Sequence, residues 1–247
     1  MLICLITIFI FGLCIGSFLN VCIYRIPKDE NITTTRSHCM ACGNVIKWYD
    51  LVPVFSYIIL GGKCRHCKTK LSAQYPVIEL LNGLLYCLVF AIKGLTVESA
   101  LICFLSSALI VIAVIDWRTY EIPFGLNVFI ACIGVINAIF DYRNFVGYLI
   151  GAVCVSGFLL ILYYLTKGRG IGGGDIKLMA AAGLFLGWKN IILALVIGCI
   201  LGSIIHLIRM KVSKAEHVLA FGPYLAAGIF ISSLWGNELI SFYLSFY

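Results

Sequence analysis

The chain has 247 residues, of which 62% are hydrophobic and 12% are charged, and its formal net charge is +7. A soluble domain is about half apolar and about a quarter charged, and one core of this size cannot bury so many apolar side chains. The composition therefore excludes a water-soluble enzyme and predicts an all-α protein that crosses a membrane several times.

Apolar segments follow one another along the whole chain. A spanning helix needs about 20 mostly apolar residues, and eight segments come near this length. They are residues 2–24, 77–92, 99–115, 124–140, 145–165, 176–188, 191–209 and 218–235. The first segment has no basic start and no small-residue cleavage site, so we expect it to be retained as a span. We expect about eight transmembrane helices, with Lys189-Asn190 between the sixth and the seventh.

The positive charges predict the orientation of these helices. Of the 18 Lys and Arg residues, 15 follow odd-numbered segments and three follow even-numbered ones. Because basic loops remain in the cytosol, we expect the N-terminus outside and residues 25–76 inside. A merged sixth and seventh segment would place the basic cluster Arg209, Lys211 and Lys214 outside, so the charge bias also favours eight spans.

The cytosolic segment between the first two spans contains two Cys-x-x-Cys pairs. Cys39 and Cys42 form the first, and Cys64 and Cys67 follow after 21 residues. A segment of about 50 residues is near the lower limit for a stable core, and this spacing is typical of a zinc ribbon with one structural ion. Two disulfides are the alternative, but a reducing compartment opposes them. A redox motif is also possible, although two pairs in one small basic loop favour metal.

Two aspartates lie at the predicted cytosolic ends of apolar segments. Asp116 ends the third and Asp175 opens the sixth, 59 positions apart. Acids at membrane depth are costly and are candidates for function, and two carboxyl groups brought together there are expected to share one proton. One can then activate water while the other polarises a peptide carbonyl. Asp175 as a helix cap and Asp116 as an ion-pair partner of Arg118 are the alternatives.

Other residues near these ends are weaker candidates. Gly172, Gly173 and Gly174 allow a close backbone approach, so an extended substrate can pair with this loop. Glu79 opens the second segment, where it is either functional or a carboxylate of a first helical turn. Glu121 lies in a short turn, where it is either simply solvated or attracts a positively charged substrate.

With these residues in hand, the chain resembles the bifunctional type IV prepilin peptidases, also called prepilin leader peptidase/N-methyltransferases. The resemblance covers nearly the whole chain and both Cys-x-x-Cys pairs. The matching motifs are Gly16-Ser17-Phe18-Leu19-Asn20-Val21, Arg25-Ile26-Pro27, Trp48-Tyr49-Asp50, Gly62-Lys63-Cys64, Tyr75-Pro76-Val77-Ile78-Glu79, Gly172-Gly173-Gly174-Asp175 and Phe221-Gly222-Pro223-Tyr224-Leu225.

The resemblance implies a membrane aspartic peptidase with Asp116 and Asp175 as its catalytic pair. It implies cleavage of type IV prepilins or pseudopilins after a glycine at the cytosolic face of a bacterial cytoplasmic membrane. It also implies methylation of the new N-terminus with S-adenosylmethionine as co-substrate. Gly62 and Lys63 lie where the family's methyl transfer is placed, and Glu79 is a further candidate.

We accordingly expect a first span (residues 1–24), a four-cysteine domain associated with methyl transfer (25–76) and a peptidase domain (77–247). The expected partners are prepilin or pseudopilin precursors and lipid, and no nucleic acid. Two alternatives remain open at this point. One is a peptidase whose metal ribbon only positions the precursor, and the other is a non-enzymatic assembly subunit or transporter with a zinc-stapled loop.

Overall fold

A computed structural model describes residues 2–213 and 219–246 of the chain. Within these residues the fold is helical, and the only β-type pairing is two isolated bridges, His38 with Val45 and Lys63 with Lys70. The long helices are α1 (Leu2–Arg25), α3 (Gln74–Lys93), α4 (Val97–Thr119), α5 (Phe124–Phe140), α6 (Phe145–Leu165), α7 (Gly173–Ser213) and α8 (Gly222–Leu244). The short ones are α2 (Phe55–Ile59), η1 (Ile26–Lys28), η2 (Trp48–Leu51) and η3 (Tyr142–Asn144).

The predicted segments coincide closely with these helices. Residues 124–140 and 145–165 match α5 and α6 at both ends. Helix α3 begins at Gln74, before Pro76, because a proline in the first helical turn lacks only an N–H that would have no partner there. The last segment was expected from Val218, but Val218 and Lys214 of the basic cluster lie outside the described residues, and α8 begins at Gly222.

Six of the described helices are long and apolar enough to cross a membrane, and α5 is a shorter apolar helix. This count differs from the eight spans expected for two reasons. Helix α5 has only 17 residues, and the sixth and seventh predicted segments both belong to α7. A non-helical residue, Gly187 (φ 76°, ψ 170°), divides α7 into two helical parts. The break therefore lies two residues before the expected Lys189-Asn190.

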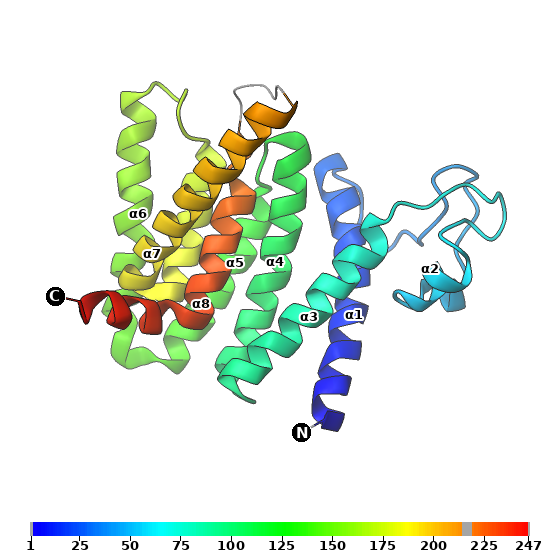
Figure 1. Ribbon diagram of the computed structural model, residues 1–247, viewed down its shortest axis with the longest axis horizontal. Helices are drawn as coiled ribbons and strands as arrows, with labels where there is room; N and C mark the ends of the chain where they lie inside the picture. The colour runs from blue at the N-terminus through cyan, green and yellow to red at the C-terminus, as the bar shows by residue number, and fades with distance from the viewer. Residues whose placement is uncertain (1, 214–218, 247) are drawn as a thin grey trace. The chain divides into compact units, whose positions relative to one another are not determined.

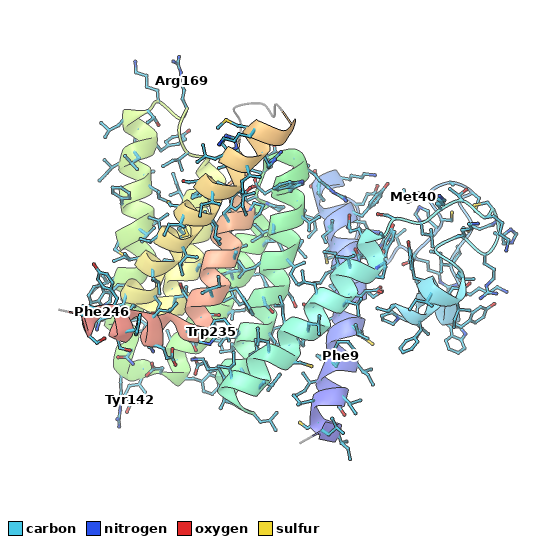
Figure 2. The ribbon with its side chains drawn as sticks, viewed as in Figure 1. Phe9, Met40, Tyr142, Arg169, Trp235 and Phe246 are labelled. Carbon is cyan, nitrogen blue, oxygen red and sulfur yellow. The ribbon has the colours of Figure 1, made fainter. Side chains whose placement is uncertain are left out.

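Helix α7 folds back at Gly187. Its first part starts after the loop that carries Arg169, which lies at the opposite end of the second unit from Tyr142 (Figure 2). Gly187 lies against Gly147, close to Tyr142 at the start of α6. The second part then runs along α8, where Gly202 lies beside Phe221 just before α8 begins. Both ends of α7 thus lie at the end of the unit where α8 starts (Figure 1).

The chain divides into two compact units, Met1–Ser99 and Ala100–Tyr247. In the first unit α1 and α3 pack through small residues. A Cβ added at Gly12 would lie 2.8 Å from Gly83 Cα, and one at Gly16 would lie 2.7 Å from Glu79 Cα. Gly12 and Gly16 form a Gly-x-x-x-Gly pair, which lets two membrane helices approach backbone to backbone. The Asn82 side-chain amide donates to the Gly12 carbonyl (2.8 Å) across this interface.

The second unit is built around the folded α7, which packs against α5, α6 and α8. Ile102, Leu105 and Ile112 of α4 are fully buried. The first part of α7 packs between α5 and α6, and its second part packs on α8 (Figure 1). One tight contact lies at Gly151 of α6, where an added Cβ would meet the Gly183 carbonyl oxygen at 2.5 Å and the Gly187 carbonyl carbon at 2.7 Å.

Because both obstacles at Gly151 are backbone atoms, a side chain there forces α6 away from α7. We predict that Gly151→Val destabilises the protein by about 1–3 kcal/mol and lowers its melting midpoint in detergent. The matched control is Gly157→Val in the same helix, where the nearest atom to an added Cβ is 3.9 Å away. Equal melting midpoints for the two variants would contradict this packing.

Candidate active site and metal centre

Asp116 lies in the last turns of α4 and is 5% exposed. Its carboxyl oxygen Oδ2 accepts a hydrogen bond from the backbone N–H of Gly222 (2.9 Å), the first residue of α8. A Cβ at Gly222 would lie 2.8 Å from the same oxygen, so only glycine permits this approach. The N-terminus of α8 also presents the positive end of the helix dipole to the carboxyl group.

Asp175 lies in the first turn of α7 and is 8% exposed. Its Oδ2 accepts a hydrogen bond from the Gly172 N–H (3.3 Å), while the Asp175 N–H donates to the Gly172 carbonyl (3.2 Å). The bond from Asp175 to the Gly172 N–H is one half of a capping box, since Gly172 has no side chain to complete the other half, so the capping alternative describes part of what Asp175 does. It does not explain why Asp175 faces a second buried acid.

The structure brings the two aspartates together at one end of the second unit. Their carboxyl groups are near enough to interact electrostatically, although α4 and α7 carry them from distant parts of the chain. Two buried carboxyl groups that interact in this way can share one proton. Such a pair combines a base for water with an acid for a carbonyl oxygen, which is the chemistry of peptide hydrolysis.

The glycine loop before Asp175 has one open and one closed side. Gly174 lies against Ile122, where an added Cβ would be 3.0 Å from the Ile122 Cβ. No atom lies within 4 Å of a Cβ added at Gly173, so its backbone is accessible. Glu121 is exposed in the turn beside Ile122.

Sequence reasoning assigned no role to Gly222 as a partner of Asp116. The residue was visible only as part of the motif Phe221-Gly222-Pro223 at the start of an apolar segment. A glycine followed by proline is typical of a helix start, but nothing in that signal names an acid 106 positions away as the partner.

The four predicted metal ligands converge in the first unit. The sulfur atoms of Cys39, Cys42, Cys64 and Cys67 all lie within 4.8 Å of one another, and the Sγ atoms of Cys39 and Cys67 are 3.8 Å apart. Tetrahedral coordination with Zn–S bonds of about 2.3 Å requires sulfur separations of about 3.8 Å. None of the twelve cysteines, all within the described residues, forms a disulfide. The donor set therefore fits one tetrahedral metal ion.

Both Cys-x-x-Cys turns have the same backbone form. Cys39 N–H donates to the Asn44 carbonyl and Cys64 N–H donates to the Thr69 carbonyl, both at 2.9 Å. The residue after each pair has a positive φ, 71° at Gly43 and 59° at Lys68. This repeated turn directs the sulfurs of each pair to one point.

Local hydrogen bonds favour the metal-binding form of two thiols. Hydrogen bonds with the side chain and backbone of Thr69 lower the pKa of the Cys67 thiol to about 6. Backbone N–H groups of Cys42 and Ala41 lower the pKa of the Cys39 thiol. Because the thiolate is the ligand, both shifts assist metal binding near neutral pH.

All three methyl-transfer candidates lie in the first unit. Glu79 is 6% exposed and accepts the Val54 N–H (2.8 Å). Gly62 (φ 65°) packs against Tyr57, whose hydroxyl would be 2.9 Å from an added Cβ. Tyr57 and Glu79 both line a cavity of about 440 Å³. Lys63 pairs with Lys70 beside the second cysteine turn and is not among the lining residues.

Comparisons with known proteins cover most of the chain. Residues 10–92 match the bacterial peptidase A24 N-terminal domain, and residues 103–207 match the type IV leader peptidase family. A prepilin leader peptidase/N-methyltransferase of Burkholderia pseudomallei (strain 1026b) is 35% identical over 89% of this chain and 81% of its own length. Proteins of the same name from Pseudomonas aeruginosa and Aeromonas salmonicida are 31% and 33% identical, over 95% and 96% of this chain and 91% and 93% of their own lengths.

No solved structure matches the chain. The two family models follow one another in the same order as the cysteine centre and the aspartate pair, and three relatives are at least 31% identical and are covered over more than four fifths of their length. The chain therefore belongs to the type IV leader peptidase family.

Proposed function

We propose that this protein cleaves the leader of type IV prepilins or pseudopilins after a glycine and then methylates the new N-terminus with S-adenosylmethionine. The observation that carries the proposal is the pair of buried aspartates, Asp116 and Asp175, held at one end of the second unit. The names of the relatives, prepilin leader peptidase/N-methyltransferase, supply the substrate class and the second activity.

In the proposed cleavage, one carboxylate of the pair takes a proton from a water molecule that attacks the scissile carbonyl carbon. The other carboxyl group, protonated, donates to the carbonyl oxygen and stabilises the charge that develops there. The proton then passes to the leaving amine as the C–N bond breaks. The N–H of Gly222 holds the Asp116 carboxyl group in place throughout.

Gly172, Gly173 and Gly174 form the proposed substrate loop. The open backbone at Gly173 allows an extended peptide to pair with the loop beside Asp175. Glu121 is exposed and follows shortly after Asp116 in the sequence. Its negative charge is suited to attract the positive charge of a leader.

We assign one structural zinc ion to Cys39, Cys42, Cys64 and Cys67, because four thiolates close a tetrahedral shell and leave no position for substrate. S-adenosylmethionine, when bound, supplies an electrophilic methyl group: the amine nitrogen forms the new N–C bond, the sulfur keeps the electron pair of the broken C–S bond, and the amine proton leaves to solvent. Gly62, Lys63 and Glu79 are the proposed residues of the methyl-transfer site.

The distribution of Lys and Arg supports a bacterial cytoplasmic membrane location with the N-terminus outside and both activities at the cytosolic face. We propose residues 25–76 as the methyltransferase-associated domain and residues 77–247 as the peptidase domain. The four cysteines lie within the first of these ranges and both aspartates within the second.

We predict that Asp116→Asn and Asp175→Asn each slow cleavage by about 10²–10⁴-fold, because each removes a group that transfers a proton. Mass spectrometry of a pilin precursor incubated with detergent-purified protein and S-adenosylmethionine measures leader loss and one added methyl group. The matched control is Asp141→Asn, which changes an aspartate in the α5–α6 turn. A wild-type cleavage rate in either active-site variant would exclude the aspartic mechanism. The alternative of a non-enzymatic assembly subunit would then be favoured.

Cleavage by a pair that shares one proton requires the singly protonated state. We therefore expect a bell-shaped dependence of kcat/KM on pH, falling in acid as the pair gains its second proton and in base as it loses the first. A cleavage rate that does not change with pH would show that the two carboxyl groups do not act as a pair.

Four thiolates should hold one zinc ion per chain in the purified protein, as measured by atomic emission. We predict that Cys67→Ser lowers this content strongly, because a hydroxyl is a poor replacement for a thiolate ligand. Cys132→Ser, at an exposed cysteine of α5, is the control and should retain the full content. An unchanged zinc content in Cys67→Ser would remove that residue from the site.

A further inference from the structure

The cavity of the first unit is bordered by two buried side chains of opposite charge. It lies among the end of α1, the start of α3 and the cysteine turns, and its volume is about 440 Å³. Arg25 and Glu79 both line it, and each is only 6% exposed. This volume is within the range of small-molecule sites in proteins.

Arg25 has no anionic partner among the residues that the structure describes. Its guanidinium donates to the carbonyl oxygens of Asn31 (3.1 Å), Thr35 (2.8 Å) and Arg36 (3.3 Å). These carbonyls hold the side chain in place without supplying an anion, and the acidic residue Glu30 lines the same cavity. A buried guanidinium is favourable when an anion joins it, and its planar donors suit a carboxylate.

Glu79 is the negatively charged counterpart of Arg25 at this cavity. Its carboxyl group accepts the Val54 N–H and a hydrogen bond from Ser17, and within the described part of the chain it forms no ion pair. Val54 has φ 62° and ψ −52°, a conformation that is unfavourable for a β-branched residue. The loop thus holds a strained backbone against Glu79, which keeps the carboxyl group at the cavity wall.

The two charged groups come to one cavity from different helices. Glu79 packs on Gly16 of α1, and Arg25 is nine residues further along that helix, so their backbones are offset by about 13 Å along α1 at 1.5 Å per residue. Both side chains are long and extend from their helices to the same cavity. A ligand with a carboxylate near Arg25 and a cationic centre near Glu79 supplies both missing counter-charges.

Aromatic side chains complete the wall. Tyr24, Tyr57 and Tyr75 line the cavity. Aromatic rings can pack on a planar base or on a cation, and the Tyr24 ring already has the Lys28 ammonium 3.9 Å from its centroid. Gly62 packs against Tyr57, and a side chain at position 62 would displace the Tyr57 ring.

From these features we propose that this cavity is the S-adenosylmethionine site, with Arg25 binding the carboxylate, Glu79 facing the sulfonium end and the tyrosines bordering the adenine. The proposal rests on the proposed methyltransferase function. It adds Arg25 and the three tyrosines to the methyl-transfer residues, and it places Gly62 as a positioning residue that acts through Tyr57.

Equilibrium dialysis of the full-length, zinc-loaded protein in detergent with radiolabelled S-adenosylmethionine tests the proposal by binding rather than by activity. We expect Arg25→Gln and Glu79→Gln each to raise the Kd about tenfold or more, because each removes a charged contact. Glu98→Gln is the matched control, since Glu98 pairs with Lys93 outside the cavity. Wild-type affinity in both cavity variants would overturn the assignment.

Because Arg25 and Glu79 also hold backbone groups, each variant should be checked for one zinc ion per chain and for wild-type prepilin cleavage. Direct photolabelling of the wild-type protein with methyl-labelled S-adenosylmethionine needs no substitution. We expect label on peptides that contain Tyr24, Tyr57 or Tyr75. Label confined to residues outside the cavity would overturn the assignment even if the variants were misfolded.

The same experiments separate this proposal from the one on which it rests. A wild-type protein that neither binds S-adenosylmethionine nor adds a methyl group contradicts the methyltransferase function itself. A wild-type protein that binds and methylates, while both cavity variants bind as well as wild type, contradicts only the cavity assignment.

Discussion

The burial of two acids at one end of an apolar helical unit is the constraint on which the second unit depends. Asp116 and Asp175 are both almost fully buried, and each receives a backbone N–H, from Gly222 and Gly172. Gly222 can reach Asp116 only if α8 starts at the end where α4 finishes. That arrangement requires α7 to return to its starting end, which it does by folding back at Gly187. The conformation of one glycine in α7 is therefore linked to the hydrogen bond of an acid in α4.

In the first unit, close helix packing also brings a buried acid to its place. Glycines at positions 12, 16 and 83 bring α1 and α3 together until their backbones nearly touch. This contact brings Glu79 to α1 and leaves a cavity between the helices and the cysteine turns. The segment between the two helices has little regular structure, and the four converging cysteines supply the cross-link that a small core cannot. In the proposed function, the zinc ion holds together the wall of the co-substrate site and takes no part in chemistry.

Both units satisfy buried charged side chains mainly with backbone groups. Asp116, Asp175 and Glu79 accept from N–H groups, and Arg25 donates to carbonyls. Backbone partners fix the position of a side chain without neutralising its charge, so the groups remain available to a proton, a substrate or a charged ligand. Side-chain ion pairs would also hold the same residues, but they would neutralise the charged groups.

Local sequence patterns predicted most of the helices and the cysteine cluster, and they singled out the two aspartates as candidates. Hydropathy is a local property, so α5 and α6 were predicted to the residue, and the spacing of Cys39, Cys42, Cys64 and Cys67 is enough to indicate a metal site. Tertiary structure alone decided the break at Gly187, the partner of Asp116 and the cavity between Arg25 and Glu79. These features join residues up to 106 positions apart through helix packing. No local pattern encodes which backbone N–H or which helix face will lie opposite a given acid, because that depends on how closely the glycines let the helices approach.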